Sequence, residues 1–193
     1  MANKALLQEI DGAPPQITFA DHAIDYNPTA ANDLRHASAV DTEVQLDLTG
    51  LADGAARQSA KVDLGEHRAA LYAVRGAFEM AATPTAGELI ELYWAPSQSA
   101  TAGTGNPGGV SGSDAAYAGY SSNLAESVLQ LIYIGSFVCT VQVATTVQIG
   151  EVGVFSPTER YGSLIVKNES GAAFHSDAVE SHVVFDPIVD ELQ

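Results

Sequence analysis

Short apolar segments that alternate with polar residues and are separated by turns constrain the fold of this chain most. Residues 43–48 and 60–64 alternate with a period of two, which is the pattern of a half-buried strand. Further strands are predicted over residues 17–19, 70–80, 88–95, 131–143, 147–155, 163–167 and 181–185. Because almost no segment has a helical period, the pattern predicts an all-β fold, an antiparallel β-sandwich that is jelly-roll-like.

A single domain is expected, because 193 residues with 46% hydrophobic content can bury one sizeable core. Residues 1–41 contain Pro14-Pro15 and Asn27-Pro28 and show no long period, so we expect an extended N-terminal arm with little regular structure. Residues 42–193 are expected to form the sandwich domain. The strands over residues 43–48 and 60–64 are predicted to pair as a hairpin with a longer connection.

The stretch from Gly87 to Val143 reads as two core strands joined by a long loop. In the first strand, Ile90, Leu92 and Trp94 share one face, which we expect to point into the core. The loop over residues 97–122 is rich in Gly, Ser, Ala and Thr, and loops of this length are usually functional or mobile. We interpret it as a projecting contact element. After it, Asn123-Leu124-Ala125-Glu126 has the spacing of a capping box and predicts one short helix over residues 124–129.

The chain is strongly acidic, with 8 Lys and Arg against 24 Asp and Glu and a formal charge of -16. No Lys, Arg or His occurs between Gly76 and Glu159. Such a surface repels phosphate backbones and anionic membranes, so we expect no nucleic-acid and no membrane partner. The lone Cys139 lies in an apolar run and is expected to be a small core residue. Because Met1–Ile10 lacks the apolar region of a signal peptide, synthesis in the cytoplasm without disulfides is expected.

No motif predicts a catalytic, cofactor-binding or metal site. Gly103, Gly105 and Gly108 match the spacing of a dinucleotide-binding turn, but further loop residues follow them instead of a helix. The histidines have no metal-binding spacing; His175 and His182 flank a predicted turn and could meet across a hairpin, but without a clear third ligand. No nucleophile elbow is present, and the EF-hand pattern is absent, although calcium binding stays open for so acidic a chain.

Two groups of residues are predicted to lie at an interface. Tyr117 and Tyr120 stand in the small-residue loop together with Asn106, and tyrosine is favoured at interfaces for its apolar body and polar tip. The alternative is that the tyrosines fold back onto the sandwich. Arg160 and Tyr161 follow the long segment without positive charge, and Arg160 is expected to pair with a carboxylate of its own or of a neighbouring chain.

Four segments resemble structural proteins of tailed-bacteriophage particles: Leu92–Ser97, Gly112–Tyr117, Pro157–Gly162 and Ile165–Asn168. The resemblance implies a non-enzymatic β-sandwich that assembles as an oligomer on the outside of the virion, as a head decoration or cement protein. The expected partners are further copies of the chain, with a trimer favoured, and the major capsid protein or another virion protein. The expected location is the virion, after synthesis in the cytoplasm of the host bacterium.

Two other functions remain open from the residues. A carbohydrate- or receptor-binding module of a phage particle would use Trp94, Tyr117 and Tyr120 to stack on sugar rings. A cupin-like enzyme would need a histidine cluster that holds a metal ion, and the spacing of the histidines does not supply one.

Overall fold

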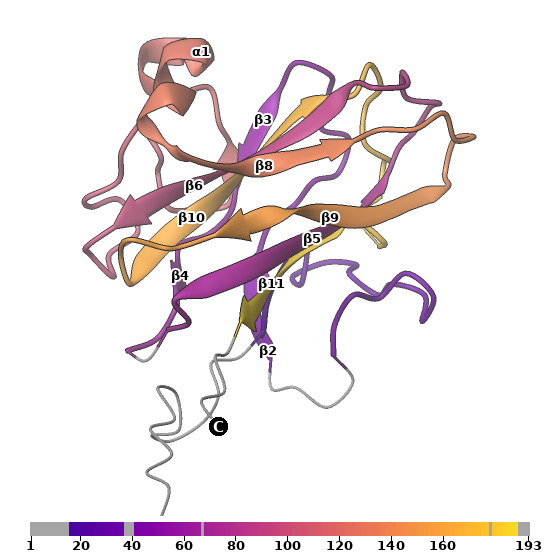
Figure 1. The fold of residues 1–193 in the computed structure, drawn as a ribbon. Coiled ribbons are helices and arrows are strands. Elements are labelled where there is room, and N and C mark those ends of the chain that lie inside the picture. The colour runs from indigo at the N-terminus through magenta and orange to yellow at the C-terminus, as the bar shows by residue number, and fades with distance from the viewer. Residues whose placement is uncertain (1–15, 37–40, 67, 178, 189–193) are drawn as a thin grey trace, which may run out of the picture.

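The computed structural model describes residues 16–36, 41–66, 68–177 and 179–188, which form an all-β sandwich of two sheets (Figure 1). The strands of the described residues are β1 (Gln16–Ala20), β2 (Asp41–Gln45), β3 (Ala56–Gln58), β4 (Val62–Asp63), β5 (Leu71–Glu79), β6 (Leu89–Ser97), β7 (Ala115–Ala116), β8 (Ile132–Val138), β9 (Val147–Phe155), β10 (Tyr161–Glu169) and β11 (His182–Ile188). The helical elements are the 3-10 turns η1 (Tyr120–Ser122) and η2 (Val128–Gln130) and the helix α1 (Leu124–Ser127).

The five-stranded sheet has the order β2-β1-β11-β5-β9. Its pairs are antiparallel except β1 with β2, which are parallel. The strand predicted over residues 17–19 is present as β1, which is fully buried between β2 and β11, so this part of residues 1–41 is not an extended arm. Residues 21–36 are also tied to this sheet, because the backbone N–H of Leu34 donates to Nε2 of His182, 3.1 Å away. Residues 1–15 and 37–40 of the expected arm lie outside the described residues.

The six-stranded sheet has the main order β7-β3-β10-β6-β8, and β4 also pairs with β10. The hairpin expected between residues 43–48 and 60–64 is wrong, because β2 belongs to one sheet and β4 to the other. One hydrogen bond of 2.9 Å, from Ala60 N to Gln45 O, joins the two segments. Both segments alternate because each lines the same core from an opposite wall, and alternation alone does not distinguish the walls.

The core between the sheets is built around Trp94, whose exposed fraction is zero. Its ring centroid lies 5.6 Å from that of Phe155 and 5.8 Å from that of Phe185, so it contacts strands of the opposite sheet. Ile90 and Leu92 are buried on the same face of β6, which confirms the predicted core face. Cys139 is free and buried as expected, and burial raises the pKa of its thiol to about 11.

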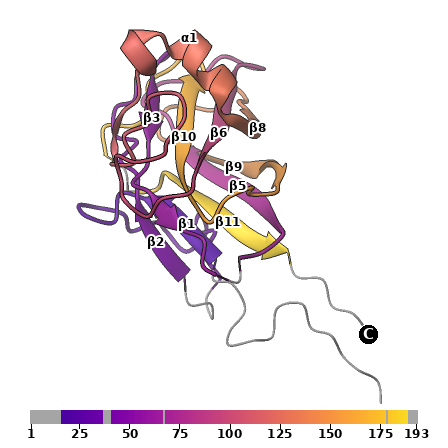
Figure 2. The same cartoon turned by 90° about the vertical axis from the view of Figure 1, so that its left-hand side faces the viewer.

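The helical turn, formed by η1, α1 and η2, lies outside the six-stranded sheet, on the side away from the five-stranded sheet (Figure 2). Asn123 caps α1, because its side-chain oxygen accepts a hydrogen bond from the backbone N–H of Glu126, as the capping-box spacing predicts. Beneath the turn, Ala95 and Ile165 of the sheet pack in a second apolar cluster. The other buried members of this cluster are Ala56, Val110, Tyr117, Val128 and Leu131.

Candidate interaction surface

The loop over residues 97–122 does not project; it folds over the outer face of the six-stranded sheet. Val110 is buried in the second apolar cluster, and β7 pairs with β3. The ammonium group of Lys61 shares its three N–H donors among four oxygens at 2.8 to 3.0 Å, namely Oγ of Ser97 and the backbone oxygens of Ser99, Thr101 and Thr104. Lys61 thus supplies the loop with the positive charge that its own sequence lacks, and the loop is a fixed part of the domain.

Two of the predicted interface residues serve this internal packing. Tyr117 is 3% exposed, and its hydroxyl donates to Gly108 O over 2.7 Å, so its place at an interface is corrected and the folded-back alternative holds. The side-chain amide of Asn106 donates to Ala102 O and Val110 O. Glycines in the loop permit this close packing: a β-carbon at Gly108 would lie 2.8 Å from the Tyr117 hydroxyl.

The other predicted interface residues are at least partly accessible, but they do not gather into one site. Arg160 pairs with its own Asp63 through two hydrogen bonds of 2.7 Å and lies over the Tyr161 ring, 5.2 Å from its centroid. Its charge is therefore satisfied within the chain. Tyr120 is 71% exposed beside the helical turn.

A different surface combines open strand edges with exposed apolar side chains. We call it the β8–β9 edge and define it as residues 132–155, which comprise β8, the connection over residues 139–146 and β9. β8 ends one sheet and β9 ends the other, so within the described chain each of these strands has a neighbouring strand on one side alone. They run side by side along one flank of the sandwich (Figure 1). Long edge strands with free backbone groups are places where another chain can pair.

Two glycines bring β8 and β9 together at one end of this flank. A β-carbon at Gly153 would lie 2.7 Å from Ile134 O, and one at Gly135 would overlap Val152 O. Each strand also carries an irregularity here, opposite Leu92/Tyr93 in β6 and Val74/Arg75 in β5. The edges of the two sheets therefore approach each other closely at these glycines.

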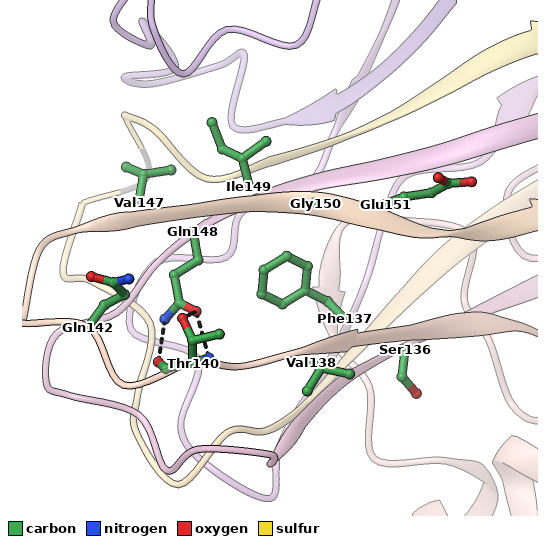
Figure 3. A pocket seen from close by; sticks show the side chains of 10 residues that line it. All are labelled: Ser136, Phe137, Val138, Thr140, Gln142, Val147, Gln148, Ile149, Gly150 and Glu151. Atoms are coloured by element: carbon green, nitrogen blue, oxygen red, sulfur yellow. Dashed lines mark hydrogen bonds between the residues drawn. The ribbon is translucent and has the colours of Figure 1, made fainter.

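Toward the connection over residues 139–146 the two strands leave a cleft of about 410 Å³ (Figure 3). The Phe137 ring lies between the strands, and Gly150 leaves room for it, since a β-carbon there would stand 3.0 Å from the ring. At the far end, Oε1 of Gln148 accepts hydrogen bonds from N and Oγ1 of Thr140, at 2.8 and 2.9 Å. The cleft is lined by neutral polar and apolar groups together with Glu151.

Apolar side chains are exposed on both sides of this cleft. Val138 and Ile149 point away from the cleft on opposite sides (Figure 3). Val141 and Val143, in the connection, are 66% and 73% exposed. The full set of exposed large apolar residues in the edge is Tyr133, Val138, Val141, Val143, Ile149 and Val154. Six exposed large apolar side chains within 24 residues are a feature of interaction surfaces.

The β8–β9 edge is also almost free of charge, because Glu151 is its sole charged residue in the sequence. Elsewhere, five basic side chains pair with carboxylates of the same chain, which leaves the acidic excess on the rest of the surface: Arg35 with Asp33, Arg57 with Asp114, Arg75 with Asp186, Arg160 with Asp63 and Lys167 with Glu91. A second acidic protein is repelled least at this edge.

The two histidines considered for a shared metal site have separate partners. His182 is fully buried; Nδ1 donates to Glu180 O, and Nε2 accepts from Leu34 N. Nδ1 of His175 instead lies 3.1 Å from a carboxylate oxygen of Asp177.

The comparisons with known proteins found no family model and no curated protein that matches this chain. No helix among the described residues is both long and apolar enough to cross a membrane. The sequence signal of the β8–β9 edge was the long segment without positive charge, together with apolar residues at alternate positions of two edge strands. We had interpreted this signal as a property of the loop over residues 97–122.

Proposed function

We propose that this chain is a non-enzymatic structural protein of a tailed-bacteriophage particle that binds the outside of the capsid as an oligomeric decoration or cement subunit. The observation that carries the assembly role is the β8–β9 edge, a strip with exposed apolar side chains and one charged residue, Glu151, on an otherwise acidic protein. The virion location rests on the resemblance of the four sequence segments. The partners in this proposal are further copies of the chain, with a trimer favoured, and the major capsid protein or another virion protein.

The order of the principal strands supports the jelly-roll interpretation. Numbered along the chain, β1, β3, β5, β6, β8, β9, β10 and β11 form one sheet in the order 1-8-3-6 and the other in the order 2-7-4-5. Two such four-stranded sheets, each joining strands that are distant in sequence, are the arrangement of a jelly roll, which viral capsid domains share with lectins and cupins. Fold alone does not choose among these functions.

The surface favours protein association over sugar binding. Trp94 and Tyr117, two of the three aromatic residues expected to stack on sugar rings, are buried. The apolar residues of the β8–β9 edge are mostly aliphatic, and aliphatic side chains suit packing against another protein. Edge strands add main-chain hydrogen bonds when a further strand pairs with them.

The first experiment measures the native mass of the purified protein by analytical ultracentrifugation. We expect an oligomer, and we expect Val143→Glu and Val154→Glu to shift it toward the monomer, because each places a charge in the apolar strip. Ile24→Glu is the matched control, since Ile24 is 79% exposed but lies outside the β8–β9 edge. A monomeric wild-type protein, or equal masses for all three variants and the wild type, would contradict assembly through this edge.

The second experiment tests the virion role. The protein is added to undecorated heads of the phage that encodes it, and the heads are sedimented. We expect saturable co-sedimentation that is weakened by Val143→Glu. Failure to bind heads or tails of that phage would overturn the virion proposal.

A further inference from the structure

Three potential metal ligands meet beside the start of β9, where the sequence spacing gave no metal site. Glu79 ends β5 opposite Val147, and His175 and Asp177 lie in the connection between β10 and β11. Nδ1 of His175 is 3.1 Å from Oδ1 of Asp177 and 4.0 Å from Oε2 of Glu79. All three ligand atoms lie within 4.8 Å of one another.

The carboxylate of Glu79 is the unusual member of this group. Glu79 is 8% exposed, and no described side chain or backbone group donates a hydrogen bond to its carboxylate oxygens. Burial raises its pKa; among its neighbours, His175 lowers the pKa, while Asp177 and Glu180 raise it. A largely buried carboxylate that accepts no hydrogen bond from the protein is costly unless water or a cation solvates it.

Nδ1 is the imidazole nitrogen of His175 that lies nearest the two carboxylates. The backbone N–H of Asp177 makes one long contact of 3.4 Å to it, which a metal bond at Nδ1 would replace. The two carboxylate oxygens lie within 4.8 Å of each other and repel each other. A positive ion between them removes that repulsion and uses all three as ligands.

We propose that Glu79, His175 and Asp177 bind a divalent first-row transition metal ion, such as zinc or manganese. One imidazole nitrogen with carboxylate oxygens suits these ions. Ligand atoms on a tetrahedral zinc ion with bonds of about 2.0–2.1 Å stand roughly 3.3 Å apart. The His175–Asp177 separation of 3.1 Å is already close to this value, and the 4.0 Å between His175 and Glu79 would have to shorten on binding.

The bound ion would complete its coordination with water. The side chain of Asp177 is 46% exposed and that of His175 is 23% exposed, so the group opens to solvent on their side. The ion would tie the β10–β11 connection to the end of β5, next to the connection over residues 139–146, because Thr145 N donates to Met80 O. This binding does not depend on the proposed virion role.

The test begins with protein freed of metal by dialysis against a chelator. Zinc chloride and manganese chloride are then titrated separately in a calorimeter, and thermal unfolding is followed with and without each ion. We expect one ion per chain for at least one metal and a higher melting temperature with it, because a ligand that binds the folded state alone stabilises that state.

The variants Asp177→Asn and Glu79→Gln distinguish metal binding at this site from metal binding elsewhere on the protein. Each retains the size of the side chain, and we expect each to weaken the affinity roughly tenfold or more. Asp177→Asn is the safer variant, because its side chain is partly exposed, and circular dichroism checks the fold of both. His22→Ala is the control, a histidine 3.7 Å from Glu43 elsewhere in the fold, and should bind as the wild type does. Absence of saturable binding of either ion, or equal affinity in both site variants and the wild type, would overturn the proposal.

Discussion

Gly135 in β8 faces the backbone carbonyl of Val152 in β9 so closely that a β-carbon at position 135 would overlap the oxygen. The two residues belong to different sheets, and their contact closes one flank of the sandwich. The strands are close together at this contact and lie farther apart toward the connection over residues 139–146. The cleft at the β8–β9 edge opens at that end. The shape of the proposed interaction surface thus depends on a residue outside the cleft.

We expect Gly135→Ala to lower the free energy of unfolding by about 1–3 kcal/mol, as overpacking does. The added methyl group has to push β8 and β9 apart, because backbone on both sides cannot yield as a side chain can. Urea denaturation followed by circular dichroism measures the change. Gly103→Ala is the control, since a β-carbon there meets nothing within 4 Å. A Gly135→Ala variant as stable as Gly103→Ala would contradict the close approach.

Trp94→Ala is expected to destabilise the protein by about 3–5 kcal/mol, because it empties the centre of the core. Trp94→Phe should cost less than Trp94→Ala. Phenylalanine retains an aromatic ring against Phe155 and Phe185, and it removes the buried indole N–H, which has no hydrogen-bond partner among the described residues. Urea denaturation is followed by circular dichroism, because Trp94 is the sole tryptophan and both variants lack tryptophan fluorescence. If Trp94→Phe were as costly as Trp94→Ala, ring packing would not be the source of the stability.

The sequence predicted those parts of the fold whose signal is local. The pattern over residues 147–155 coincides with β9, and the apolar face of residues 88–95 is the core face of β6. The partner of β1 was not predictable from such patterns, because Ile17 pairs with Phe185 at the other end of the chain. The strand over residues 17–19 was therefore predicted, but its place inside the five-stranded sheet was not.

The β8–β9 edge was not predicted from the sequence, and part of the reason lies in Lys61. The segment without positive charge between Gly76 and Glu159 contains this edge. We interpreted the loop over residues 97–122 in that segment as a projecting contact element. The loop is held by a lysine from a distant segment, which composition does not show, and the open surface is the β8–β9 edge instead.

Lys61→Met should loosen the loop over residues 97–122. Methionine keeps much of the apolar stem but donates no hydrogen bonds to the oxygens of Ser97, Ser99, Thr101 and Thr104. We expect faster hydrogen exchange and faster proteolysis within the loop, with a loss of about 1–3 kcal/mol in the free energy of unfolding. Lys167→Met is the control, because Lys167 pairs with Glu91 and Glu169 and makes no ion pair with the loop. Equal protection of the loop in both variants would show that Lys61 does not hold it.

His182 should make the protein less stable below neutral pH. Burial lowers the pKa of this histidine from its ordinary value of 6.5, so the folded state keeps it neutral at a pH where the unfolded chain binds a proton. Its hydrogen bonds agree, since a proton on Nε2 would remove the acceptor of Leu34 N. Stability is therefore present above pH 6.5 and is lost as the pH falls from 6.5 toward the lowered pKa. Melting temperatures between pH 5 and 8 measure the loss.

The buried Glu79 produces the opposite slope, because its raised pKa makes the folded state bind the additional proton as the pH falls. A variant is therefore needed to isolate the contribution of His182 to the pH dependence of stability. His182→Gln keeps a neutral hydrogen-bonding side chain, and we expect it to flatten the decline in melting temperature below pH 6.5 while leaving the contribution of Glu79 in place. His36→Gln is the control, since the His36 side chain is 64% exposed. If both variants kept the wild-type pH dependence, protonation of His182 would not be its cause, and the assignment of a neutral buried imidazole bridging Leu34 and Glu180 would be wrong.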